Sequence, residues 1–463
     1  MSDIRDVWRR SHGYTEEQLH RYAADLEWLL EDPRFQGSDF TPPESVTKFL
    51  KLAQMMEAEV IRLMSAGPPY EPRTDLDGAF GIAHIHAFFP PKWIEFLTSL
   101  GLPESAITTD MAKEWEPLLE KGVPLVNGNM LSNHAWAVSD PAWSLLFPSY
   151  LALLLDPSIK APWGNDPAWI KVDDADQLSF ALVGDWSTGT WTDGDAPVCP
   201  PDAVMREIEK FGVDYTVHLG DVYPLGSTQF YGSFLEGWKP GRRGAFNFNG
   251  NHDMYGWARG YFESLTHPTF ATQQGTSYFA VELGGWIVVG LDTSYFDDSM
   301  LVGTGSVRDP DQTAFLGRVR EQVNETGQRI FMLTHHLALN QAGTRTTSVW
   351  DDVVSDGALG KPPDVWYYGH YHAAAVYSAD SVVGKTTKAR VMGHGALPFA
   401  PPEELAQNAG PGKPIECYAH TPYDDDDPMR RGRAMNGFAH VTLTEDGGIT
   451  ERFLNQDGSD ICR

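Results

Sequence analysis

The chain has 463 residues, with 35 basic against 63 acidic side chains and a formal net charge of -28. This length exceeds a usual single hydrophobic core and predicts two domains, or one large domain with a second region. The negative charge repels phosphate backbones and anionic lipid at long range, so we expect neither a nucleic-acid coat nor a membrane among its partners.

The cysteines and the apolar stretches indicate the class of protein. Cys199, Cys417 and Cys462 are widely spaced and form no CxxC motif. We therefore expect neither a disulfide framework nor a thiolate zinc site, and a reducing, cytoplasmic compartment. The arginine pair at 9–10 is not followed by an apolar signal segment, and the most apolar stretch, 145–155, is too short to cross a bilayer.

Residues 1–175 are predicted to form a mainly helical N-terminal region, whose role the sequence does not indicate. The segment at 15–30 opens with a capping box and continues with apolar residues at helical intervals. A second helix is expected over 41–63, with proline in its first turn. His84 and His86 lie two residues apart, but no further ligand residues cluster near them. A packed or surface pair is therefore favoured over a metal site.

From residue 176 to 463, short apolar runs alternate with helical segments, which is typical of an α/β domain. Strands are expected at 178–183, 213–219, 245–249, 329–333 and 364–368, and helices at 202–211 and 311–323. Two strand pairs, within 277–292 and 438–454, turn at Gly-Gly and indicate antiparallel strands. We therefore expect a two-sheet sandwich flanked by helices.

Side chains that can bind metals follow the ends of these strands. They are Asp185, Asp221, Asn251, His335, His370 and His372. The carboxyl ends of strands in an open α/β sheet meet at one crevice, which would bring these residues together. Oxygen and imidazole donors in this mixture suit Mn, Fe or Zn, and there are too many of them for one ion. With Asp221 as the natural bridge, the sequence predicts a dinuclear site suited to displacement at phosphorus.

The order of these motifs resembles that of the calcineurin-like metallophosphoesterase superfamily. The matching features are Asp185, Gly-Asp at 220–221, Gly-Asn-His-Asp at 250–253, His335 and Gly-His-Tyr-His at 369–372. The resemblance covers residues 178–400 and extends towards 455. It implies a four-layer α/β/β/α sandwich. It also implies a first metal held by Asp185, Asp221 and His372, and a second metal held by Asp221, Asn251, His335 and His370.

The resemblance also assigns roles to neighbouring residues. His252, beside the ligand Asn251, is expected to contact the phosphoryl group and to protonate the leaving oxygen, and Asp253 is grouped with it as catalytic. His336 follows a ligand and is expected to lie just outside the donor set. His394 stands in a glycine turn after another strand, where a structural turn is favoured over a place at the rim of the cleft.

One ligand of the superfamily is missing at Ser187, where most members have a histidine. Purple acid phosphatases lack that histidine and use a tyrosine three residues after the second aspartate, but that position is Pro224 here. Tyr223 lies one residue early, and on an extended segment a one-residue shift turns a side chain to the opposite face. We therefore expect water to complete the first metal, with Ser187 or Tyr223 as outer ligands, or as direct ligands if the turn bends, and no assured tyrosinate–iron colour.

These features predict a hydrolase that uses a metal-bridging hydroxide on a small phosphomonoester. A phosphodiesterase of the same superfamily and a non-catalytic metal-binding scaffold are the alternatives. The absent histidine at Ser187 argues against a cyclic-nucleotide phosphodiesterase. Arg242, Arg243 and Arg345 are candidates to hold an anionic substrate. The natural substrate, the metal identity and the oligomeric state are left open.

Overall fold

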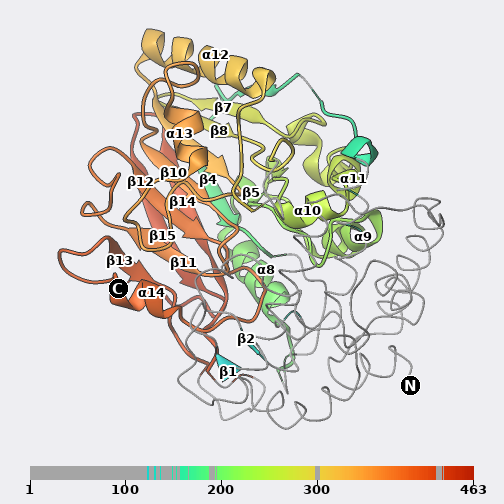
Figure 1. The fold of residues 1–463 in the computed structure, drawn as a ribbon, viewed down its shortest axis with the longest axis vertical. Helices are drawn as coiled ribbons and strands as arrows, with labels where there is room; N and C mark the ends of the chain where they lie inside the picture. Colours follow the sequence, from blue (N-terminus) through green and yellow to red (C-terminus); the bar gives the residue numbers. More distant parts are fainter. Residues whose placement is uncertain are drawn as a thin grey trace, which may run out of the picture.

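The computed structural model describes residues 157–164, 166–186, 193, 196–297, 303–423, 430 and 432–462, with a few residues between 123 and 153. The helices expected at 15–30 and 41–63, the pair His84 and His86, and Ser187 lie outside these described residues. The described part is a mixed α/β fold with two large sheets and surrounding helices (Figure 1).

A five-stranded sheet has the order β15-β14-β4-β5-β6. Its strands are β4 Gln177–Val183, β5 Tyr215–His218, β6 Gly244–Asn247, β14 Gly437–Thr444 and β15 Ile449–Asn455. β4, β5 and β6 are parallel, whereas β14 is antiparallel to both β4 and β15. The carboxyl ends of the three parallel strands therefore lie at the same edge of the sheet.

An eight-stranded sheet has the order β13-β11-β12-β10-β9-β8-β7-β3. Its strands are β3 Ala168–Lys171, β7 Phe279–Leu283, β8 Trp286–Gly290, β9 Arg329–Thr334, β10 Val365–Tyr368, β11 Ala374–Tyr377, β12 Lys388–Met392 and β13 Ile415–Tyr418. β8, β9, β10 and β12 are parallel to one another. β3 pairs with β7, so the α/β fold begins before the boundary expected between residues 175 and 176.

The helices flank the two sheets. They are η5 Pro157–Ile159, α8 Pro200–Phe211, α9 Thr228–Gly237, α10 Asn251–Tyr255, α11 Arg259–Ser264, η6 Pro268–Gln273, α12 Pro310–Thr326, α13 Ser348–Val354 and α14 Glu403–Gln407, and the short strands β1 Val123–Pro124 and β2 Met130–Leu131 form a separate pair. α12 begins where the Asp309 carboxylate accepts from the Gln312 backbone N–H, and ends at the left-handed Gly327. None of the helices in the described part combines the length and apolarity needed to span a bilayer.

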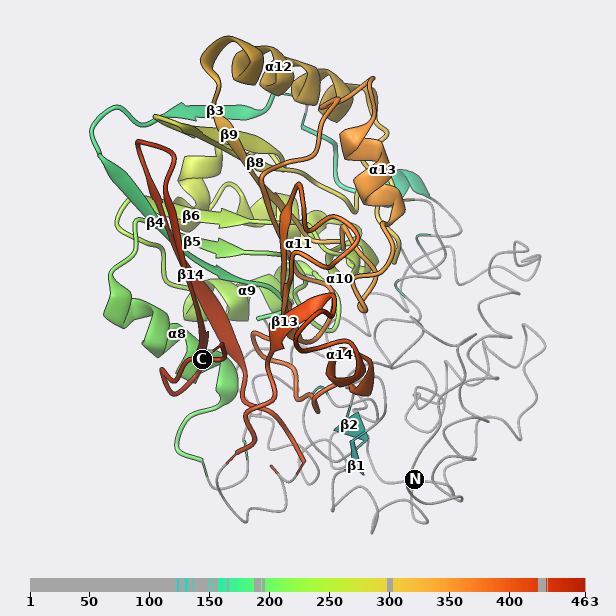
Figure 2. The ribbon, with the colours of Figure 1, turned by 90° about the vertical axis from the view of Figure 1, so that its left-hand side faces the viewer.

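Apolar side chains between the two sheets form the main core. Phe180 of β4 stacks on Phe331 of β9 with ring centroids 6.3 Å apart, and Phe246 of β6 stacks on Phe279 of β7 at 4.1 Å. On β9, Ile330 and Met332 alternate with Phe331 and belong to a second core that includes α12 and α13 residues. Figure 2 shows β4, β5 and β6 side by side, with α8 and α9 near them and α12 beside the other sheet.

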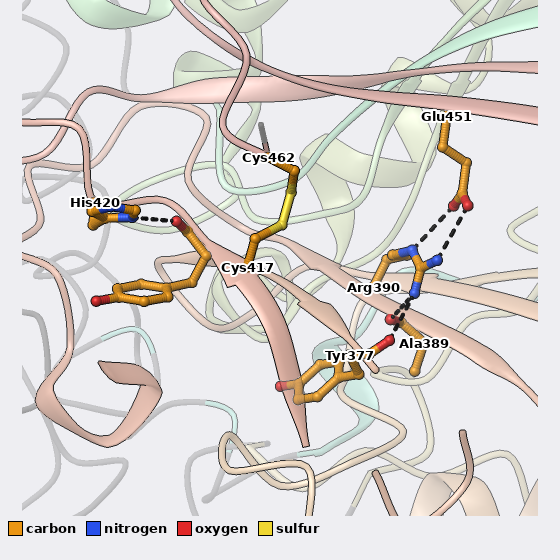
Figure 3. Close-up of a disulfide and its surroundings, with 8 residues drawn as sticks. Tyr377, Ala389, Arg390, Cys417, His420, Glu451 and Cys462 are labelled. Atoms are coloured by element: carbon orange, nitrogen blue, oxygen red, sulfur yellow. Dashed lines mark hydrogen bonds and ion pairs between the residues drawn. A yellow bond between two sulfur atoms is a disulfide. The ribbon is translucent and has the colours of Figure 1, made fainter. Parts of the chain in front are cut away.

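A disulfide and a partly buried ion pair connect elements of the two sheets (Figure 3). Cys417 of β13 is bonded to Cys462, with Cα atoms 5.6 Å apart. Arg390 of β12 donates to both carboxylate oxygens of Glu451 on β15, at 3.1 Å each. Burial alone would raise the pKa of Glu451, but the charge and hydrogen bonds of Arg390 lower it. Both links join elements far apart in sequence.

The disulfide corrects the expectation drawn from the cysteine count. Wide spacing in the sequence does not prevent pairing, because the C-terminal segment after β15 returns to β13 at the edge of the other sheet. Disulfides persist in oxidising compartments. The cysteines therefore no longer support a reducing compartment for this chain.

The double variant Cys417→Ser/Cys462→Ser should be less stable than the wild type by about 2–4 kcal/mol. The disulfide closes a loop of 45 residues and restricts the unfolded chain. Urea unfolding with and without reductant would measure the loss, and Cys199→Ser, at the remaining cysteine, is the matched control. If reductant destabilises the wild type no more than it does the double variant, the pair is not formed.

Candidate metal centre

The strand ends of both sheets supply one group of polar side chains. Asp185 and Asp221 follow β4 and β5, and Asn251 opens α10 after β6. From the eight-stranded sheet, His335 follows β9, and His370 and His372 follow β10. Asp185, Asp221 and His335 are fully or almost fully buried. Parallel strands from two facing sheets thus direct their carboxyl ends to one place, as expected from the sequence.

The first cluster joins Asp185, Asp221, His372 and Tyr223. The Tyr223 hydroxyl lies 2.7 Å from Asp185 Oδ1, 3.0 Å from Asp221 Oδ2 and 2.7 Å from His372 Nε2. His372 Nε2 and Asp185 Oδ1 are 3.5 Å apart. The ligand atoms of Asp185, Asp221 and His372 all lie within 4.8 Å of one another. Four side chains therefore converge on one point.

The second cluster joins Asn251, His335, His370 and the other oxygen of Asp221. Asn251 Oδ1 lies 3.0 Å from His335 Nε2 and 2.9 Å from His370 Nδ1. The two imidazole nitrogens are 3.3 Å apart. Asp221 Oδ1 lies 3.4 Å from His335 Nε2, whereas Asp221 Oδ2 belongs to the first cluster. The Asp221 carboxylate therefore lies between the two clusters, with one oxygen towards each.

The backbone adopts sparsely populated conformations at these residues. Asp185, Asp221 and His370 all have left-handed φ angles, of 56°, 73° and 66°. Such values are uncommon for residues other than glycine and are found where tertiary structure or function requires them. Gly220 has φ of 101°, and a Cβ there would lie 2.5 Å from His335 Nδ1. The glycine of the Gly-Asp motif thus lets the chain approach a histidine of the second cluster.

Further hydrogen bonds orient the donors. His335 Nδ1 donates to the Leu219 carbonyl at 2.8 Å, which directs Nε2 towards Asn251. The backbone N–H of His370 donates to Asp185 Oδ2, and that of His252 donates to Asp221 Oδ1, both at 2.9 Å. Histidines that bind metals commonly have their other ring nitrogen held in this way. The arrangement is therefore preorganised.

Burial makes the charged forms of the carboxylates and imidazoles in both clusters unfavourable. It raises the pKa of Asp185 to about 8 and that of Asp221 well above its usual range. It also lowers the pKa of His335 and His370, and that of His372 to about 4. Divalent cations would reverse the effect on the carboxylates and would coordinate neutral imidazole. The donor set and its burial therefore fit metal ions.

The Tyr223 side chain turns towards the first cluster, which is the alternative that a bent turn allows and an extended segment does not. An extended segment after Asp221 would point this side chain away, but the left-handed φ of Asp221 breaks the alternation of faces. The Tyr223 side chain is 1% exposed and lies within the first cluster. Pro224 instead presents its carbonyl to His252 Nδ1 at 2.7 Å.

His252 and Asp253 occupy different environments. The His252 ring lies 4.3 Å from the Tyr223 ring, at the edge of the first cluster, with Nδ1 held by Pro224. The Asp253 carboxylate accepts from the backbone N–H groups of Asp221 and Gly250, at 3.2 and 2.6 Å, and from the Tyr231 hydroxyl at 2.8 Å. The Asp253 carboxylate thereby connects the loop after β5 with the loop after β6. It therefore holds these loops in place, and the catalytic role of Asp253 stays a prediction.

His336 and His394, the two remaining histidines expected near the donor set, have different surroundings. His336 lies beside the second cluster, with its ring centroid 4.7 Å from that of His370. The His394 side chain is fully buried against Phe399, and neither of its ring nitrogens has a hydrogen-bond partner among the described residues, so it belongs to the packing of its turn.

Two of the three arginines proposed to hold a substrate anion lie at the end of the sheet opposite the clusters. Arg242 and Arg243 precede β6 at the amino ends of the parallel strands, where Arg242 contacts Asp214 at 3.0 Å and Arg243 contacts Asp174 at 2.9 Å. Arg345 is exposed in the loop between β9 and α13. The expectation that these side chains hold the substrate is therefore wrong for Arg242 and Arg243.

Comparison with known proteins gives limited similarity. No family model matches the chain, and no curated protein matches it. Among solved structures, 67 chains match. One of them, described as "GAP50 the anchor in the inner membrane complex of Plasmodium", is 12% identical, with a TM-score of 0.39 over 62% of this chain and 88% of that chain.

Proposed function

We propose that the chain is a dinuclear metal-dependent phosphoester hydrolase of the calcineurin-like metallophosphoesterase superfamily. The observation that carries this proposal is the Asp221 carboxylate, which directs one oxygen towards each of two donor clusters. Two packed sheets with helices outside them are compatible with the four-layer α/β/β/α sandwich that this assignment implies.

The two proposed metal sites share Asp221 and differ in their other donors. Asp185, Tyr223 and His372 would complete the first site, and Asn251, His335 and His370 the second. These donors suit Mn, Fe or Zn. When bound, two such ions lower the pKa of coordinated water towards neutrality and stabilise negative charge on phosphoryl oxygens.

The protein's own residues provide the rest of the chemistry. With Nδ1 held by the Pro224 carbonyl, His252 can exchange a proton at Nε2 with the leaving oxygen of an ester at the first cluster. Asp253, which accepts a hydrogen bond from Tyr231, holds the loops of Asp221 and Asn251 together. The formal charge of -28 disfavours long anionic polymers, so we propose a small phosphomonoester as substrate.

Metal analysis combined with an ester panel tests the proposal. The chain should hold two equivalents of Mn, Fe or Zn and should hydrolyse an aryl phosphate monoester faster than the matching diester. Preference for the diester would move the activity to a phosphodiesterase. A chain that binds metal but hydrolyses no ester would be a metal-binding scaffold, and a chain that binds no metal would overturn the proposed centre.

The Tyr223→Phe variant tests the composition of the first site. Loaded with ferric iron, the wild type should show visible phenolate-to-iron charge-transfer absorption, because the Tyr223 hydroxyl is within 3.0 Å of two carboxylates of the cluster. Tyr223→Phe should lose this absorption and should bind iron more weakly. Tyr261→Phe, at a buried tyrosine outside the clusters, is the matched control and should keep the absorption. If the wild type binds iron but shows no such absorption, Tyr223 is not a ligand, and water completes the first site.

A further inference from the structure

His336 lies among the donors of the second cluster although it is not needed for the proposed ligand set. It directly follows His335 at the end of β9 and is 1% exposed. His335, His336 and His370 each offer a ring nitrogen within 4.8 Å of the others. The ring centroid of His336 is 4.9 Å from that of His335 and 4.7 Å from that of His370. Three imidazoles therefore surround one point.

All three imidazoles are held in the manner of metal ligands. His335 Nδ1 donates to the Leu219 carbonyl, and the His370 imidazole is hydrogen-bonded to the Gly303 backbone. His336 Nδ1 lies 2.8 Å from the Thr293 hydroxyl, which also accepts from the His336 backbone N–H at 3.1 Å. When Nδ1 carries the proton it donates to Thr293 Oγ1, and Nε2 is then the ring nitrogen with a lone pair that could bind a metal ion.

We propose that His336 is a third imidazole ligand of the second metal site and that Thr293 positions it. This inference rests on the proposed dinuclear centre. A site with three imidazoles is richer in nitrogen than the first site, where the carboxylates of Asp185 and Asp221 and the Tyr223 hydroxyl accompany one imidazole. The second site should therefore favour Zn²⁺ over Mn²⁺, because imidazole suits zinc and carboxylate oxygen suits manganese.

Metal titration of chelator-stripped protein, in competition with a chromophoric chelator, tests this assignment. His336→Gln should weaken Zn²⁺ binding at one site on the order of 10²-fold, because it removes one of the five protein donors proposed for that site, and should leave the other site unchanged. The same variant should reduce the preference for Zn²⁺ over Mn²⁺. His394→Gln, which also removes a buried imidazole, is the matched control and should bind both metals as the wild type does.

Variants of Thr293 test the role of His336 even if His336→Gln does not fold. Thr293→Val should weaken Zn²⁺ binding about 10-fold, and Thr293→Ser, which keeps the hydroxyl, should restore it. Unchanged Zn²⁺ affinity in His336→Gln together with weaker binding of inorganic phosphate would overturn the assignment, because His336 would then be a hydrogen-bond donor to the phosphoryl group. A wild type that binds two Zn²⁺ ions with no effect of any of these variants would overturn this inference alone. A wild type that binds no metal would overturn the proposed function as well.

Discussion

Asp221→Ala is expected to remove both metals at once and to reduce ester hydrolysis to background. The two oxygens of this carboxylate face different clusters, so one substitution takes a donor from each site. A site that loses one of about four protein ligands falls by orders of magnitude in metal affinity. Asp221 also accepts a hydrogen bond from the His252 backbone N–H and has a left-handed φ of 73°, so Asp221→Ala should in addition lower the stability of the metal-free chain.

Metal content after dialysis, determined together with thermal unfolding of the metal-free and metal-loaded forms, measures this effect. Asn251→Ala and His370→Ala are the matched controls, because each removes a donor from the second cluster only. Both should lose one equivalent of metal and retain the other. If Asp221→Ala keeps one metal at wild-type affinity, Asp221 does not bridge the two sites.

The site residues at the strand ends could be predicted from sequence because their placement follows from topology. Asp185, Asp221, His335 and His370 come directly after apolar runs, and parallel strands must bring their carboxyl ends to a common edge. The Gly-Gly turns at 284–285 and 447–448 likewise identify the antiparallel pairs β7–β8 and β14–β15. Local sequence patterns are sufficient to predict the position of a side chain where that position depends only on the direction of its strand.

Tyr223, Asp253 and the disulfide depend on contacts that no local pattern reports. The Tyr223 side chain reaches the first cluster because Asp221 adopts a left-handed conformation, which is held by the hydrogen bond from its N–H to Asp253. The Cys417–Cys462 pair depends on the return of the C-terminal segment after β15 to β13 of the other sheet. Residue spacing along the chain therefore could not decide between the two directions open to Tyr223, and the cysteine spacing did not indicate the pairing.

His252→Ala is expected to keep both metals and to lose roughly 10²- to 10⁴-fold in the rate of ester hydrolysis, the range typical of a positioned acid or base. The His252 imidazole lies beside the Tyr223 ring, and its Nδ1 is committed to the Pro224 carbonyl. The donor atoms of the two clusters come from other side chains. The loss should therefore appear in turnover and not in metal content.

The dependence on the leaving group separates proton transfer from a merely structural role. A leaving group that departs readily without protonation, such as p-nitrophenolate, needs His252 less than phenolate or an alkoxide does. The loss in His252→Ala should therefore grow from p-nitrophenyl phosphate to phenyl phosphate to an alkyl phosphate. His252→Gln, whose amide can still donate to the Pro224 carbonyl, should show the same trend, whereas His267→Ala, on an exposed histidine, should show none. An equal loss for all three esters would mean that His252 shapes the site without transferring a proton, and loss of a metal would make it a ligand.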